Sequence, residues 1–407
     1  MRDDCFFLIL AGLLFFIFEV MARGQYAHKI NDRITLLEKL VVSNATYNKS
    51  LFLGFHGREN EASEFFRRFA KIPSVYRPYI EWRRLPSMHS PLINLNSLSY
   101  RGKDFAVKKS QGVYHILIYG GSFVWGTGAL RDNETIAGHL EGMLNQSSNQ
   151  RRYEVINCGE TGFNTTQEVI YLMIEGLFLQ PDLVIFLDGV NDTYAGYKGY
   201  PAGYPEHYER YNNLLTGNLK EREKESFTVD TELEYLKNQR KVIWDSKESE
   251  ILNRINDTLK GKQEPGVEKI KDYTTPEEFA LRHFYNVRAA RALGEDFGFS
   301  VLAAIQPVPV FFKPLHPQEK LALETVRKAS PDYHMELTYW ENYYNQYADQ
   351  VISLSKGAGV PVCDLRKVFE NDTRPLYIDD CHVTSDGYNT VAERLYSAIK
   401  PIINNAQ

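Results

Sequence analysis

Short apolar runs alternate with segments of helical spacing from residue 112 almost to the C-terminal end. Five runs have the pattern of buried strands: 114–119, 154–157, 183–187, 299–305 and 360–364. Three segments place apolar residues on one helical face: 134–144, 166–179 and 385–399. Because strands alternate with helices, the pattern predicts an α/β fold, a parallel-sheet three-layer α/β/α sandwich with helices on both faces.

An apolar segment near the N-terminus stands apart from this pattern. Residues 5–22 are apolar except for Glu19, and their length lies between that of a signal-peptide core and that of a membrane span. Because no convincing small-x-small cleavage site follows, residues 1–23 are expected to form an uncleaved signal-anchor, a transmembrane helix. A cleaved signal peptide and a buried core helix stay open as alternatives. The flanking charges do not fix the orientation of the span.

Two further segments lie outside the alternation. Residues 24–110 are polar with scattered aromatic clusters, and we expect a stalk and a lead-in that packs on the main domain of residues 111–403. Residues 196–275 lack strand patterns and are dense in charge, which indicates a helical insertion after the third strand. An insertion at the carboxyl end of a parallel strand lies over the ligand crevice, where it could act as a lid or as a decoration.

Composition excludes some function classes. The formal net charge is -5, so no basic surplus points to nucleic acid. The chain has 26 Tyr, which are expected mainly in the core and secondly at a glycan or protein surface. Its cysteines are Cys5, Cys158, Cys363 and Cys381, none in a Cys-x-x-Cys pair, so no zinc site is expected. Free thiols are favoured over a disulfide among the last three, and no cofactor or metal is implied.

Four polar or glycine-rich blocks follow the predicted strands or lie in a loop beside them. They are GGSFVWG at 120–126, NCGETG at 157–162, GVND at 189–192 and DDCH at 379–382. Ligand sites in open α/β sheets form at the carboxyl ends of the strands, so these blocks are expected to meet. Ser122 comes directly after the first strand, at a strand-to-helix turn that exposes its hydroxyl group.

The blocks, in this order, resemble the SGNH hydrolases, also called the GDSL esterase and lipase family, over roughly residues 112–195 and 299–399. The resemblance implies a flavodoxin-like sheet. The family's signature Ser, Gly, Asn and His, and the Asp of its Asp-x-x-His, are matched in turn by Ser122, Gly162, Asn191, His382 and Asp379.

One residue departs from the family pattern. The usual Gly-Asp-Ser reads Gly-Gly-Ser here, so Gly121 replaces an acidic residue that is not the nucleophile. This variant, together with the leader residues Glu19 and Arg23, resembles a membrane-anchored subgroup that is associated with bacterial polysaccharides.

The residue types predict a catalytic triad. Ser122 is a weak nucleophile until a base takes its proton, and His382 can do so near neutral pH. Asp379 can hold the correct tautomer of the ring. The resemblance implies an oxyanion hole made by the N–H groups of Ser122 and Gly162 and the side-chain amide of Asn191. Asp380 also precedes the histidine and is expected to point away from it.

The favoured hypothesis is a serine esterase that removes acyl groups, acetyl among them, from a carbohydrate. An O-acyltransferase with the same triad is an alternative, and a catalytically silent glycan-binding or assembly protein is another, although the intact triad argues against the latter. The expected partners are an acylated small molecule or glycan and, through the N-terminal helix, a membrane. From this function we expect the domain to lie outside the cytoplasm.

Overall fold

The computed structural model describes residues 55, 57–86, 88–147, 151–197, 199–205, 275–329 and 336–405. The expected anchor, residues 1–23, lies outside this part of the chain, as does most of the expected insertion, residues 206–274. Within the described part, no helix combines the length and the apolar character that a membrane span requires.

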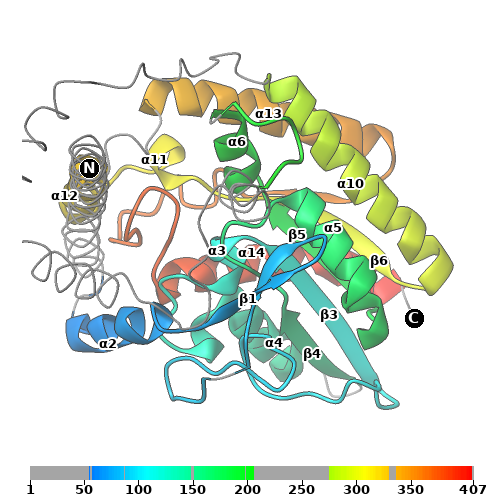
Figure 1. Ribbon diagram of the computed structural model, residues 1–407. Coiled ribbons are helices and arrows are strands. Elements are labelled where there is room, and N and C mark those ends of the chain that lie inside the picture. The colour runs from blue at the N-terminus through cyan, green and yellow to red at the C-terminus, as the bar shows by residue number, and fades with distance from the viewer. Residues whose placement is uncertain are drawn as a thin grey trace, which may run out of the picture. The chain divides into compact units, whose positions relative to one another are not determined.

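Five parallel strands form the central sheet (Figure 1). They are β3 (Val113–Gly120), β4 (Arg152–Asn157), β5 (Leu183–Asp188), β6 (Ser300–Ile305) and β7 (Val362–Asp364). Their order is β4-β3-β5-β6-β7, and every neighbouring pair is parallel. This is the flavodoxin-like order, in which the chain reverses direction across the sheet between β3 and β5. The predicted parallel sheet is confirmed. The last strand is shorter than expected because Pro361 has no N–H to give to the ladder.

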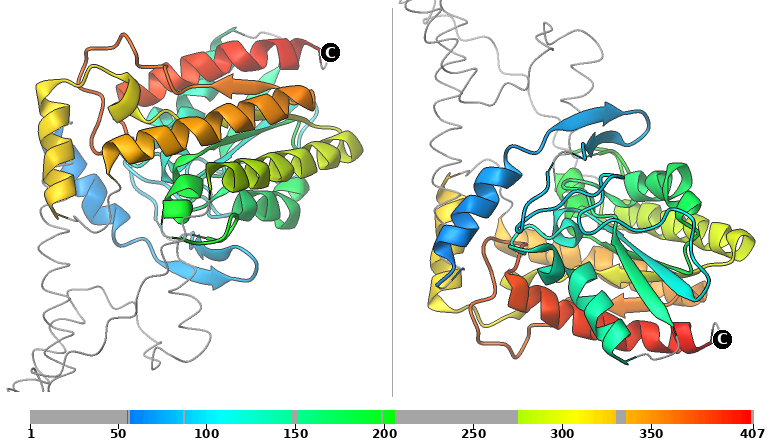
Figure 2. Two further views of the ribbon diagram at one scale, coloured as in Figure 1. Left: turned by 90° about the horizontal axis from the view of Figure 1, so that it is seen from above. Right: turned by 90° about the horizontal axis from the view of Figure 1, so that it is seen from below.

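Helices cover both faces of the sheet (Figure 2). They are α4 (Ile136–Ser147) and α14 (Ser385–Asn405) on one face, and α5 (Thr165–Ile174), α10 (Pro276–Phe297) and α13 (Leu337–Gly357) on the other side. Successive side chains of each strand point to opposite faces of the sheet. Ile116 and Ile118 pack in the core cluster of α4 and α14, whereas Leu117 and Tyr119 pack in the cluster of α5 and α10. This alternation produces the three layers.

One predicted helix is broken. The segment 166–179 forms α5 as far as Ile174, and a separate 3-10 turn, η3 (Gly176–Leu179), follows. Gly176 lies against the side chain of Tyr119, where an added Cβ would be 2.1 Å from the hydroxyl oxygen. Glycine therefore permits close approach to the sheet but weakens the helix at that point. In contrast, α14 runs beyond the predicted 399 and includes Pro401.

Residues 59–101, part of the segment expected as stalk and lead-in, pack on the sheet domain. Their elements are α2 (Glu59–Phe69), β1 (Ser74–Arg77) and β2 (Glu81–Arg84), the two strands forming an antiparallel hairpin. Trp82 contacts Phe163 edge to face, with ring centroids 5.7 Å apart. The remaining short or peripheral helices are α3 (Ser122–Trp125), η2 (Asp132–Glu134), α6 (Val190–Tyr197), α11 (Pro309–Phe312) and α12 (Pro317–Ala329).

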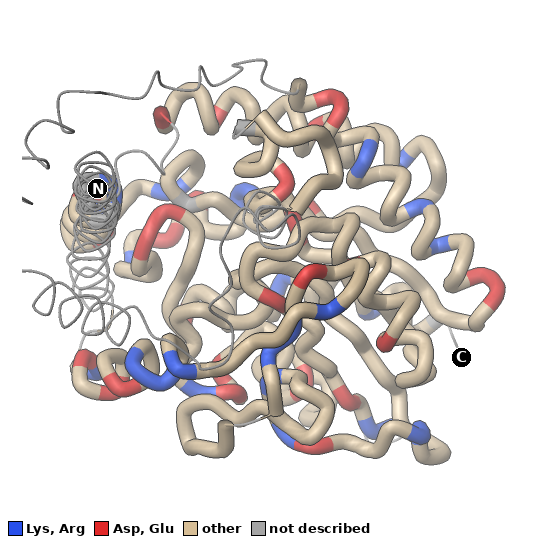
Figure 3. The backbone as a smooth tube through the Cα atoms, viewed as in Figure 1, with Lys and Arg blue, Asp and Glu red and all other residues tan. Residues whose placement is uncertain are grey.

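Basic and acidic residues are interspersed over helices and loops (Figure 3). One of the basic residues, Arg101, has a fully buried side chain. Its Nη1 donates to the carbonyl oxygens of Trp125 at 3.1 Å and Gly126 at 2.8 Å, and its Nη2 donates to that of Ala129 at 2.7 Å. Its Nε donates to Asp132 at 2.9 Å. The guanidinium group thus satisfies the inward-facing carbonyls of the loop that follows α3.

We predict that Arg101→Met lowers the free energy of unfolding by about 3–5 kcal/mol, because it leaves buried carbonyls and a partly buried carboxylate without their donor. Urea unfolding measures this change. Arg152→Met is the matched control: Arg152 is 65% exposed beside Glu154, and its loss is expected to cost at most about 1 kcal/mol. Equal unfolding midpoints for the two variants would contradict the role given to Arg101.

Candidate active site

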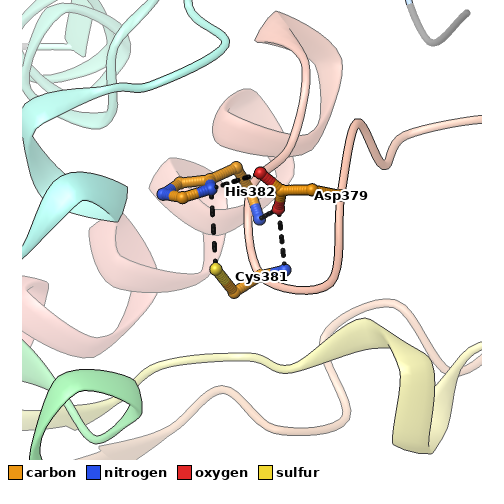
Figure 4. Close-up of side chains that lie close together, drawn as sticks. All are labelled: Asp379, Cys381 and His382. Carbon is orange, nitrogen blue, oxygen red and sulfur yellow. Dashed lines mark hydrogen bonds and ion pairs between the residues drawn. The ribbon is translucent and has the colours of Figure 1, made fainter. Parts of the chain in front are cut away.

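Three of the predicted residues form a continuous chain of hydrogen bonds. Ser122 begins α3, directly after β3, and its Oγ lies 2.7 Å from Nε2 of His382. On the other side of the ring, Nδ1 lies 2.7 Å from Oδ2 of Asp379 (Figure 4). Because an ionised carboxylate can only accept, Nδ1 carries the proton in the neutral ring, and the lone pair of Nε2 faces the serine hydroxyl.

The Asp379 carboxylate also shapes the loop that carries the histidine. Its Oδ1 accepts from the backbone N–H of Cys381 at 2.9 Å and from that of His382 at 2.7 Å. One side chain therefore fixes both the ring and its backbone. The neighbouring Asp380 faces elsewhere and accepts a hydrogen bond of 3.2 Å from the hydroxyl of Tyr194.

A buried ion pair anchors the start of the same loop. Oε1 of Glu319 accepts from the backbone N–H groups of Leu376 at 2.8 Å and Tyr377 at 3.0 Å. Its Oε2 lies 2.7 Å from Nζ of Lys313, and both side chains are almost completely buried. Sequence reasoning missed Glu319, because a helical glutamate gives no sign that its partners are backbone groups almost sixty residues away.

The expected oxyanion donor Asn191 lies beside Gly121, and Gly162 lies in the loop that follows β4. Gly162 has a φ of +80° in a turn closed by the 3.2 Å bond from the N–H of Phe163 to the carbonyl of Glu160. A residue with a side chain would be strained there. Asn191 Nδ2 donates to the carbonyl of Phe163 at 2.6 Å. This bond uses one amide hydrogen and leaves the other as a possible donor.

Gly121 explains the departure from Gly-Asp-Ser. A Cβ added at this position would lie 2.2 Å from Nδ2 of Asn191. No side chain fits without moving the amide, so the backbone before Ser122 approaches Asn191 more closely than an aspartate would allow. In this chain the glycine belongs to the packing of the expected oxyanion hole.

Two buried arginines from β2 hold the loop that contains Gly162. Nη1 of Arg83 lies 3.1 Å from Oε1 of Glu160, and both side chains are buried. Nη2 of Arg84 donates to Oγ1 of Thr161 at 3.1 Å. No sequence signal links the two arginines to this loop, because the contacts arise only when the hairpin folds over it.

Three buried acids lie on the elements that carry or adjoin Asn191. Burial raises the pKa of Glu168 and Asp188 well above the usual range, and it raises that of Asp192 to about 6. The charge of Asp188 adds to the effect of burial on the pKa of Glu168, and the charge of Asp192 adds to the effect of burial on the pKa of Asp188. Oδ1 of Asp192 accepts from the hydroxyl of Thr165 at 2.9 Å.

The electrostatics favour a charged histidine. Burial lowers the pKa of His382, but the charge and hydrogen bond of Asp379, with a smaller effect of Asp380, outweigh it. The pKa of His382 is therefore raised above 6.5. Burial would raise the pKa of Asp379, but the interactions with His382 and the two backbone N–H groups hold it well below its usual range. The imidazolium form of His382 is thus stabilised.

No protein-family model matches the sequence, and the comparison with curated proteins found no match. Solved structures of low similarity exist. An acetyl xylan esterase has 14% identity and a TM-score of 0.38, covering 70% of this chain and 99% of its own. An acetylxylan esterase from Geobacillus stearothermophilus has 11% identity and a TM-score of 0.39, with coverages of 70% and 94%.

A protein from Parabacteroides merdae ATCC 43184, named as a GDSL-like lipase, has 13% identity and a TM-score of 0.38, covering 70% of this chain and 94% of its own. These similarities are too low to assign the chain to a family. The chemistry of the site therefore rests on its own geometry.

We predict that Gly121→Asp slows the labelling of Ser122 by a fluorophosphonate about 100-fold or more, because the new side chain displaces the Asn191 amide, and loss of one oxyanion donor has effects of this size. The labelling rate is followed on the full chain, with melting curves to show that the fold persists. Gly142→Asp is the control, since a Cβ at Gly142 meets nothing within 4 Å. Unchanged labelling of Gly121→Asp would show that Asn191 is not part of the oxyanion hole.

Proposed function

We propose that this protein is a serine esterase that hydrolyses acyl esters. The observation that carries the proposal is the pair of 2.7 Å contacts that link Ser122 to His382 and His382 to Asp379. A serine, a base and an orienting acid in hydrogen-bond contact are the parts that nucleophilic acyl transfer needs.

In the proposed first half-reaction, Oγ of Ser122 attacks the ester carbonyl while Nε2 of His382 takes its proton. The oxyanion of the tetrahedral intermediate accepts from the N–H groups of Ser122 and Gly162 and from the Asn191 amide. When the intermediate collapses, the C–O bond to the alcohol breaks. His382 then returns the proton to the departing oxygen, and the acyl group stays on Ser122.

In the second half-reaction, water gives a proton to Nε2 of His382 and attacks the acyl-enzyme. The second tetrahedral intermediate releases the carboxylic acid and restores Ser122. If a sugar hydroxyl replaces water, the same residues perform O-acyl transfer. The acceptor thus separates the esterase from the alternative acyltransferase.

We propose an acylated carbohydrate, with acetyl as the acyl group, as the substrate. Exposed tyrosines near the loop of Gly162 support this choice. Tyr79, on the hairpin that packs against Phe163 through Trp82, is 80% exposed. Tyr204 is 40% exposed, and its carbonyl accepts a 2.7 Å bond from Asn164. Tyrosine offers a flat apolar face with a polar edge, which suits a sugar ring.

We further propose that the chain is anchored in a membrane, with the described domain on the extracytoplasmic side. The apolar segment 5–22 and the proposed polysaccharide substrate support this location. Protease protection of the domain in sealed cells, compared with opened cells, tests the proposal.

Ser122→Ala is expected to lower kcat for acetate release by about 10⁵–10⁶-fold, because the nucleophile is lost while the binding groups stay in place. Free acetate from acetylated xylan and the hydrolysis of p-nitrophenyl acetate measure this. Ser385→Ala is the matched serine control and should stay active. Formation of an acetylated acceptor sugar in place of free acetate would favour the acyltransferase, and activity that persists in Ser122→Ala would refute the proposal.

Asp379→Asn is expected to lower turnover about 10⁴-fold by favouring the wrong ring tautomer, whereas Asp380→Asn should keep most of it. In the wild type, kcat/KM should rise with pH as His382 loses its proton, with a midpoint above 6.5. Because the charge of Asp380 raises the pKa of His382, Asp380→Asn should move this midpoint to lower pH. A dead Asp380→Asn beside an active Asp379→Asn would reverse the assignment.

A further inference from the structure

The turn that carries the proposed base also gathers three different metal-ligating groups. Sγ of Cys381 lies 3.5 Å from Nδ1 of His382, and Oδ2 of Asp379 lies 2.7 Å from the same nitrogen (Figure 4). The three ligand atoms all lie within 4.8 Å of one another. Cys381 is half-buried.

We propose that Asp379, Cys381 and His382 bind a thiophilic divalent cation, such as Zn²⁺, and that the bound ion switches off the proposed esterase. The inhibitory part of this proposal rests on the proposed function, whereas the binding part does not. Thiolate, imidazole and carboxylate are the ligands that Zn²⁺ prefers, and hard cations such as Mg²⁺ and Ca²⁺ avoid sulfur.

The spacing suits a tetrahedral ion. Bond lengths of about 2.3 Å to sulfur and about 2.0–2.1 Å to nitrogen place those two ligands about 3.5 Å apart. Sγ of Cys381 and Nδ1 of His382 have that separation already, at 3.5 Å. The distance between Oδ2 of Asp379 and Nδ1 of His382 has to increase by about 0.7 Å when the ion binds. A water molecule then provides the fourth ligand of the ion.

The loop can hold the ion without unfolding. Asp379 uses Oδ1 for the backbone N–H groups of Cys381 and His382, so Oδ2 can bind metal while that turn persists. Glu319 fixes the start of the loop independently of the three ligands. The charge of Asp380, which already acts on the ring of His382, also favours a cation.

Binding at Nδ1 has a direct consequence for the base. The neutral ring of His382 carries its proton on Nδ1, and a metal ion on that nitrogen transfers the proton to Nε2. Nε2–H then faces Oγ of Ser122 and cannot accept a proton from it. The thiol of Cys381 releases one proton to solvent, while Asp379 is already ionised. Each ion bound by the neutral ring therefore releases one proton, each ion bound by the imidazolium releases two, and binding strengthens as the pH rises.

The first experiment titrates ZnCl₂ against p-nitrophenyl acetate turnover by the full chain. Wild type should be inhibited, and Mg²⁺ and Ca²⁺ should have no effect at the same concentrations. Cys381→Ser and Cys381→Ala should keep turnover without zinc but need at least about tenfold more Zn²⁺ for half-inhibition. Equal zinc sensitivity of wild type and both variants would overturn the proposal.

The second experiment measures binding without activity. Zn²⁺ affinity is determined by competition with a chromophoric chelator for Ser122→Ala and for Ser122→Ala combined with Cys381→Ser. Loss of one zinc equivalent in the double variant supports the site even if no ester is hydrolysed. Identical zinc binding by the two proteins overturns it even if the esterase is real, and melting curves confirm that both are folded.

Discussion

The position of Ser122 depends on the buried guanidinium group of Arg101. A strand-to-helix turn that presents its N–H groups to a substrate must point carbonyl oxygens inward, where they need donors. Arg101 supplies them to Trp125, Gly126 and Ala129 from one planar, rigid group. The turn that carries Ser122, the proposed nucleophile, is thus held by a residue that precedes the sheet in the chain.

The loop of His382 and the loop of Gly162 are also held by buried charged side chains. Glu319 holds the loop of the proposed base through two backbone N–H groups, and Arg83 holds the loop that contains Gly162 through Glu160. Each interaction places a charge in the interior, where an unpaired charge is costly. Buried charged groups therefore determine the positions of these loops, because moving a loop would leave a charge unpaired. The loops themselves lie at the edge of the central sheet.

Much of this arrangement could be predicted from the sequence. The apolar runs gave the parallel sheet, and the short blocks pointed to Ser122, Asp379 and His382, which the fold brings into contact. Arg101 and Glu319 could not be found, because their partners are backbone groups that only the tertiary fold brings near. Neither could the contact of Cys381 with the histidine ring, since it depends on the conformation of one turn.

The buried acids Glu168, Asp188 and Asp192 change the number of protons that the chain binds when it folds. The formal net charge of -5 counts every carboxyl group as ionised, but Glu168, Asp188 and Asp192 have raised pKa values in the folded chain. Their contribution to stability is full below the unfolded carboxyl pKa of about 4 and is lost as the pH rises through the folded values. Asp379 has a depressed pKa, so its contribution to stability is present above the unfolded pKa and is lost as the pH falls. In mildly acidic solution the three groups with raised pKa values therefore take up protons as the chain folds, and in the native protein they carry less negative charge than the sequence implies.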